Sequence, residues 1–195
     1  MVRRGGEPHQ GLDHRLRLLD GFAGVLVRDD YGGYLSYGTG LAGVQQCLAH
    51  LYRYLDDAYA IDPVSQVWTR QAGDALRAAS AAVRAARDAH QADLDPALLA
   101  GLRHSYDQAI AYGISVNLSR PWHKGNHPGL ILARRLKRKT AQVWLFATRF
   151  DVPATNNGSE VRHEVAVRRE ALEFEGGARP PRWAVAAVRW ELGAA

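Results

Sequence analysis

Apolar residues recur every three or four positions through the middle of the chain, a spacing that places them on one face of a helix. Leu48, Leu51 and Leu55 begin the pattern, and an Ala-rich stretch with strong helix preference follows. The helices that this pattern predicts cover residues 46–60, 62–90, 95–112 and 130–139. Weaker patterns predict a short helix over 12–20, a helix rather than a strand over 142–148, a helix from near Asn157, and a helix or strand over 183–192.

Two Asp-Pro pairs are typical of helix starts. Asp62-Pro63 and Asp95-Pro96 each combine a side chain that can cap a helix with a proline suited to its first turn. Gly113 is expected to end the helix that begins after Asp95.

The short apolar run 24–28 predicts a buried strand of a parallel sheet, and residues 42–46 are a candidate second short strand. The first ends on Asp29 and Asp30, at the end of a strand where ligands bind in open α/β folds. A carboxylate there can hold a hard cation such as Mg²⁺ through oxygen. The alternative interpretation is a turn in which Asp caps the next helix.

A second acid, Glu160, follows the polar run 155–159 and falls in the first turn of a predicted helix. If the intervening chain folds back, Glu160 can meet Asp29 across a metal ion, since two carboxylates plus substrate phosphates are a normal set of Mg²⁺ ligands. The alternative is an acid that simply favours the positive end of a helix.

Composition narrows the class of protein. The chain has 195 residues, of which 47% are hydrophobic, and a formal net charge of +5, which permits binding to a polyanion without requiring it. The single cysteine, Cys47, excludes an internal disulfide and a C-x-x-C zinc site. There is no secretory signal, and no apolar run approaches the roughly 20 residues that cross a bilayer. We therefore expect a cytoplasmic protein with no membrane partner.

Other polar residues have a structural and a functional interpretation. Cys47 and His50 form Cys-x-x-His without further paired ligands, which favours packing plus a hydrogen bond over a metal site. His123 and His127 lie in a loop broken by glycine and proline, which argues against a metal pair on a helix face. Trp122 can stack on a base, or it can anchor the loop in the core.

The predicted helix over 130–139 is strongly basic. Either its charges form a solvated face or they contact phosphates without reading sequence. The residues concerned are Arg134, Arg135, Lys137, Arg138 and Lys139.

Four segments, taken in order, resemble the central catalytic domain of transposases from bacterial insertion sequences of the IS66 type. The region of resemblance covers residues 12 to 160 of the chain. The four segments are LLDGFAGVLVRDDYGGY, QQCLAHLYRYL, the block from RPWHKGNHP to RRLKRK, and FDVPATNNGSE.

The resemblance implies a ribonuclease H-like α/β fold that is mostly helical, with a large all-α insertion. It implies an Asp-Asp-Glu triad that holds two divalent ions, Mg²⁺ or Mn²⁺, to cut and join DNA strands at insertion-sequence ends. In this chain Asp29 matches the second Asp of the triad, and Glu160 matches the Glu.

The chain also departs from the family pattern. No strand-borne Asp precedes Asp29, so the first three strands of the fold are expected to be absent and the strand 24–28 to lack neighbours on one side. The sequence after Glu160 is unrelated to the family. We expect an inactive, truncated fragment, or one that needs full-length transposase as a partner. The alternative is a non-catalytic helical module that binds DNA or a transposase.

These expectations divide the chain into five parts. They are a disordered tail (1–11), a remnant of the ribonuclease H-like core (12–46), the helical insertion (47–150), a final core helix carrying Glu160 (151–175) and an unrelated, possibly frame-shifted tail (176–195).

Overall fold

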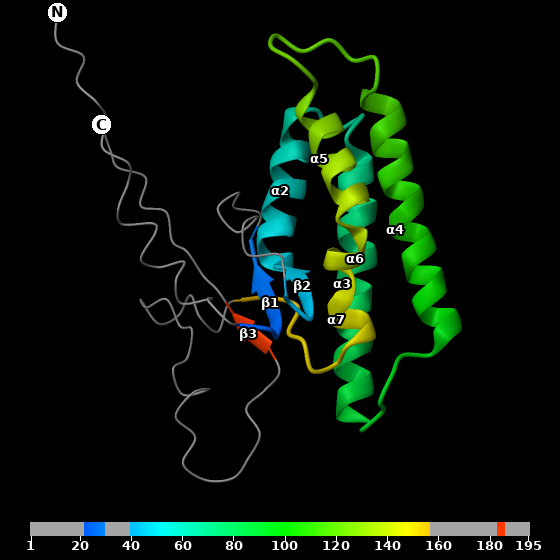
Figure 1. Ribbon diagram of the computed structural model, residues 1–195. Coiled ribbons are helices and arrows are strands. Elements are labelled where there is room, and N and C mark those ends of the chain that lie inside the picture. The colour runs from blue at the N-terminus through cyan, green and yellow to red at the C-terminus, as the bar shows by residue number, and fades with distance from the viewer. Residues whose placement is uncertain (1–21, 30–39, 157–182, 186–195) are drawn as a thin grey trace, which may run out of the picture.

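The computed structural model describes residues 22–29, 40–156 and 183–185. A bundle of long helices makes up most of this part, and a small sheet packs against one side of it near α2 (Figure 1). The predicted mostly helical α/β class is therefore confirmed. The elements are β1 (Val25–Arg28), β2 (Gly43–Gln46), α2 (Leu48–Ile61), α3 (Val67–Asp88), α4 (Pro96–Asn117), α5 (Pro128–Arg138), α6 (Thr140–Val143), α7 (Leu145–Thr148) and β3 (Trp183–Val185).

The sheet has three parallel strands in the order β2-β1-β3. Val25 pairs with Gly43 on one side and with Trp183 on the other. Both predicted N-terminal strands are confirmed, each starting one residue later than expected. The expectation that β1 lacks a neighbour on one side is wrong, because β3 pairs with that edge and satisfies its backbone groups. The predicted helix or strand near residue 183 is a strand.

One glutamine joins the sheet to the bundle. Gln45 of β2 has no exposed surface, and its amide donates a hydrogen bond to the Val143 carbonyl (3.2 Å). Its side-chain oxygen accepts a hydrogen bond from the Phe146 N–H (2.8 Å). Both partners flank Trp144, where the helical run breaks into α6 and α7. Gln45 therefore satisfies backbone groups that the break leaves without helical partners.

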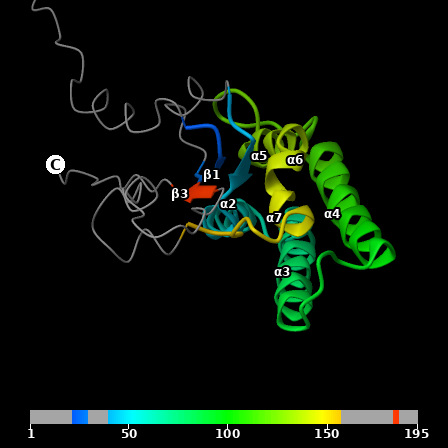
Figure 2. The same cartoon turned by 60° about the horizontal axis from the view of Figure 1, so that its bottom comes forward.

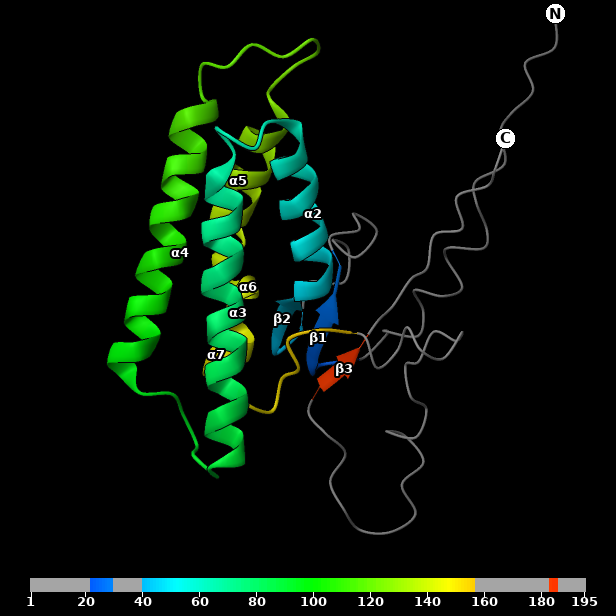
Figure 3. The same cartoon turned by 180° about the vertical axis from the view of Figure 1, so that it is seen from behind.

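The main core lies between the helices. Trp68 and Leu76 of α3 pack with Tyr106 of α4 and Trp144, all of them buried. The Tyr106 and Trp144 rings meet edge to face at 5.5 Å. Seen from two further directions, α4 lies on the side of the bundle away from the sheet (Figures 2 and 3). Each long helix buries one stripe, as the apolar spacing predicts.

The predicted helix start at Asp62-Pro63 is wrong, because α3 begins at Val67. The Asp62 carboxylate instead accepts hydrogen bonds from the backbone of Val64 (3.2 Å) and Ser65 (3.4 Å), and Arg120 forms an ion pair with it at 2.9 Å. Asp62 therefore stabilises a turn before the helix.

The second predicted start is confirmed, since the Asp95 side chain caps α4 by accepting a hydrogen bond from the Leu98 N–H (2.8 Å). The predicted end at Gly113 is wrong, because α4 continues to Asn117. A Cβ atom at Gly113 would lie 2.4 Å from the Trp68 ring. This glycine therefore permits a close helix contact and does not end the helix.

Candidate functional site

The site is built on the carboxyl edge of the sheet. Asp29 follows β1, and Cys47 follows the neighbouring parallel strand β2. The Cys47 N–H donates a hydrogen bond to the Arg28 carbonyl (2.7 Å), so the two strand ends lie side by side. Asp29 is half-buried. Its position at the end of a buried parallel strand agrees with the sequence prediction.

A distant segment is attached to the same edge. The Cys47 thiol donates a hydrogen bond to Asn156 Oδ1 (2.8 Å), and the Asn156 N–H donates to the Cys47 sulfur (3.5 Å). The Leu48 N–H donates to the Ala154 carbonyl (2.9 Å). Cys47 and Asn156 are each only 1% exposed. The chain that leads toward Glu160 therefore passes the strand end next to the one that carries Asp29.

Cys47 is a packed, hydrogen-bonded residue, as the structural interpretation expects. Burial raises the pKa of its thiol, but hydrogen bonds with His50 and with the Asn156 backbone outweigh this effect and leave the pKa below its usual value. Within 22–29, 40–156 and 183–185 there is no group of three His, Cys, Asp or Glu side chains that could hold a metal ion.

Glu160 lies outside the described residues, four positions beyond Asn156. The expected meeting of Glu160 with Asp29 therefore stays a prediction.

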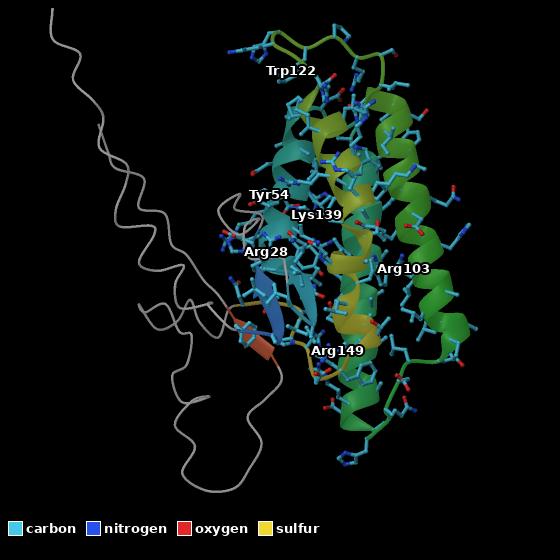
Figure 4. All side chains as sticks on the ribbon, in the orientation of Figure 1. Arg28, Tyr54, Arg103, Trp122, Lys139 and Arg149 are labelled. Carbon is cyan, nitrogen blue, oxygen red and sulfur yellow. The ribbon has the colours of Figure 1, made fainter. Side chains whose placement is uncertain are left out.

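The five basic residues at the end of α5 do not share one environment. Arg134, Lys137 and Arg138 are exposed. Arg135 is half-buried and places its guanidinium 4.6 Å from the centre of the Tyr54 ring, and Lys139 is half-buried as well. In Figure 4, Tyr54 and Lys139 lie midway along the bundle, away from the loop that carries Trp122. Three of the predicted DNA contacts therefore face solvent, and Arg135 packs against α2.

The loop before α5 caps this helix and packs against itself. His127 is buried, and its Nδ1 accepts a hydrogen bond from the Gly129 N–H (3.1 Å), which caps α5. The Trp122 ring packs against the His127 ring at 4.8 Å. His123 is exposed, whereas His127 is buried, so the two histidines do not share one environment. Trp122 and His127 therefore form a loop anchor.

A row of three arginines and one serine on α3 was not predicted from the sequence. Arg77, Ser80, Arg84 and Arg87 recur at helical spacing and line a groove of about 480 Å³ between α2, α3 and the segment before Asn156. Their spacing was a visible signal within an otherwise Ala-rich helix.

The comparison with protein families decides which group the chain belongs to. Residues 6–178 match the model of the family described as "Transposase IS66 family". The chain is a member of the IS66 transposase family. No curated protein and no solved structure matches it. This IS66-family chain has, in the part that the structure describes, no helix that is both long and apolar enough to cross a bilayer.

Proposed function

We propose that this IS66-family chain acts on DNA, and that Asp29 and Glu160 hold divalent ions, Mg²⁺ or Mn²⁺, for cutting and joining DNA strands. The observation that carries the proposal is the family match over residues 6–178, which includes both acids. Two further facts support it. Asp29 ends a parallel strand, and the hydrogen bond between Cys47 and Asn156 brings the segment leading to Glu160 to the same edge of the sheet.

The chemistry of the donors fits such an ion in part. Asp29 offers the carboxylate oxygen that Mg²⁺ prefers. Cys47 and Asn156 hydrogen-bond to each other, so they support the edge and are not ligands in this proposal. When bound, a pair of divalent ions would activate the attacking oxygen and stabilise the leaving oxygen of the DNA backbone.

We further propose that this chain by itself does not cleave DNA. Two acids of the family triad are assigned in its sequence, and no residue is assigned as the third. A two-ion site that lacks one of three carboxylates binds metal weakly and loses its alignment. A ribonuclease H-like core around β1 and β2, interrupted by a helical insertion over 47–150, is part of the same proposal.

The proposed DNA contacts are Arg134, Lys137 and Arg138, with Arg135 and Lys139 beside them. The first three are exposed on one short helix, where they can reach phosphates. Such contacts give affinity without sequence readout, and that affinity falls steeply with salt.

A metal-binding and nicking assay tests the catalytic part. Mn²⁺ binding and nicking of supercoiled plasmid would be measured for the wild type, Asp29→Ala, Glu160→Gln and the control Asp57→Asn, which changes an exposed acid of α2. We expect weak Mn²⁺ binding that is lost in the first two variants and kept in the control, with no nicking. Binding that survives in Asp29→Ala would contradict the metal site. Nicking that disappears in both site variants would support the metal site and contradict the inactivity.

The alternative function is a non-catalytic helical module that binds DNA or a transposase. The exposed cations of α5, on a bundle that has its own core, favour this possibility. DNA binding in the presence of EDTA separates the two functions. The non-catalytic module is favoured over the metal-dependent function by three results taken together. Asp29→Ala leaves DNA binding unchanged, the double variant Arg134→Gln with Arg138→Gln reduces it, and no metal binding depends on Asp29.

A further inference from the structure

The groove on α3 has no role in the function proposed above. Tyr52 of α2 lines one wall, and Thr155 belongs to the wall formed by the segment before Asn156. On α3, the groove is lined by Arg77, Ser80 and two further arginines, Arg84 and Arg87. None of the described residues that line it is acidic. Three guanidinium groups around one groove of about 480 Å³ give it a strongly positive potential.

The three arginines differ in what they already contact. Arg87 donates hydrogen bonds to the carbonyls of Phe150 and Val152, so it holds the wall of the groove in place. Arg77 lies over the Tyr52 ring at 4.8 Å and pairs with an exposed acid, Asp74, at 2.9 Å. These two side chains are therefore committed in part to the protein itself.

Arg84 is different. It is exposed, and within the described ranges it has no hydrogen bond or ion pair. It lies on the same face of α3 as Arg77, seven residues further along the helix, which is two helical turns. Its guanidinium is thus the group in the groove that is available to an incoming anion.

The groove adjoins the proposed catalytic edge. Leu48, which follows Cys47, lines the groove, and so does Thr155, which precedes Asn156. Cys47 and Asn156 are joined by the hydrogen bond that attaches this segment to the sheet. A ligand in the groove therefore lies next to the end of β2, which neighbours the strand that ends at Asp29.

We propose that this groove binds a phosphodiester group of the DNA strand that runs to the sheet edge, with Arg84 as its principal contact. The planar fork of a guanidinium matches two phosphate oxygens, and Thr155 brings a further hydroxyl group to the wall. The inference rests on the proposed function, and it adds a second DNA contact on α3, apart from the basic residues of α5. Its role is to position the strand, because no lining residue is one of the proposed metal ligands.

The test measures binding of the full chain to a fluorescent single-stranded oligonucleotide in EDTA, over a range of salt concentrations. The variant is Arg84→Gln, and its matched control is Arg70→Gln, which removes the same charge from the same helix outside the groove. We expect Arg84→Gln to weaken binding about tenfold, the lower end for a charge-assisted hydrogen bond. The slope of log K against log salt should fall by about 0.7. Arg84→Lys should keep the slope and recover only part of the affinity, because the ammonium lacks the fork.

The outcomes separate the two proposals. If Arg84→Gln and Arg70→Gln bind equally, while the exposed α5 variants bind more weakly, the groove is not a DNA contact and the DNA-binding function stands. If the wild-type chain binds no DNA even at low salt, the proposed function is itself contradicted. If inorganic phosphate or a mononucleotide binds as tightly as the oligonucleotide and depends on Arg84, the groove is a site for a free anion, and the assignment to a strand is overturned.

Discussion

Replacing Gly113 by alanine tests the packing of α4 on α3. The new Cβ atom would lie 2.4, 2.7 and 2.8 Å from three atoms of the Trp68 ring, whereas carbon atoms in contact stay about 3.5–4.0 Å apart. The ring would have to retreat by about 1 Å, and Trp68 has no exposed surface toward which it could move. Overpacking of this kind typically costs about 1–3 kcal/mol, and the rigid, buried ring points to the upper end.

A second glycine of α4 provides the matched control. Gly101 is exposed, and a Cβ atom there would meet nothing within 4 Å. Replacing glycine by alanine inside a helix stabilises that helix by about 1 kcal/mol at either position. Because this gain is common to both substitutions, the difference between Gly113→Ala and Gly101→Ala isolates the clash with Trp68.

Urea denaturation followed by circular dichroism measures the two free energies of unfolding. We expect Gly101→Ala to be more stable than the wild type by about 0.5–1 kcal/mol. Gly113→Ala should be less stable than Gly101→Ala by about 1–3 kcal/mol. Equal stabilisation by both substitutions would refute the close contact between α4 and the Trp68 ring.

Three further predictions concern hydrogen bonds. Gln45→Ala leaves the Phe146 N–H buried without its acceptor. Urea denaturation should show a free energy of unfolding that is lower by about 1–3 kcal/mol, and a loss below about 0.5 kcal/mol would contradict this role of Gln45. Hydrogen bonds from Ser65 and Arg120 lower the pKa of Asp62 to about 2, whereas an aspartate of an unfolded chain has a pKa of roughly 3.9. The ionised Asp62 therefore stabilises the folded protein above about pH 4, and this contribution is lost as the pH falls toward 2. The stability difference between wild type and Asp62→Asn should shrink across that window, and a constant difference would contradict it. Burial lowers the pKa of His127 below 6.5, so the folded protein should lose stability as the pH falls below that value and the side chain has to be protonated. His127→Asn keeps a capping acceptor but does not titrate. The drop in melting temperature between pH 7 and pH 5 should therefore be smaller in this variant.

Much of the fold could be predicted because helices follow from local spacing. The long helices and both N-terminal strands are where the apolar pattern placed them. The errors came from residues with two possible roles. Gly113 can end a helix or admit a neighbouring ring, and only the position of Trp68, far away in the sequence, decides between them. Asp62 likewise can cap a helix or a turn, and its partner Arg120 comes from another part of the chain.

The candidate site was predictable only in part. Asp29 could be placed at a strand end from local sequence alone. The hydrogen bond between Cys47 and Asn156 joins residues 109 positions apart, which no local pattern reveals. The arginine row on α3 was visible as spacing, but its groove exists only because the segment ending at Thr155 packs beside the helix.

The single thiol of this chain can serve as a reporter of movement. Cys47 is buried while it is hydrogen-bonded to Asn156. A maleimide therefore reaches the thiol when the segment that ends at Asn156 separates from the sheet. The labelling rate of the unmodified protein therefore measures how often the chain leading to Glu160 leaves the sheet. Slower labelling in the presence of an oligonucleotide would mean that bound DNA keeps this segment packed against the sheet.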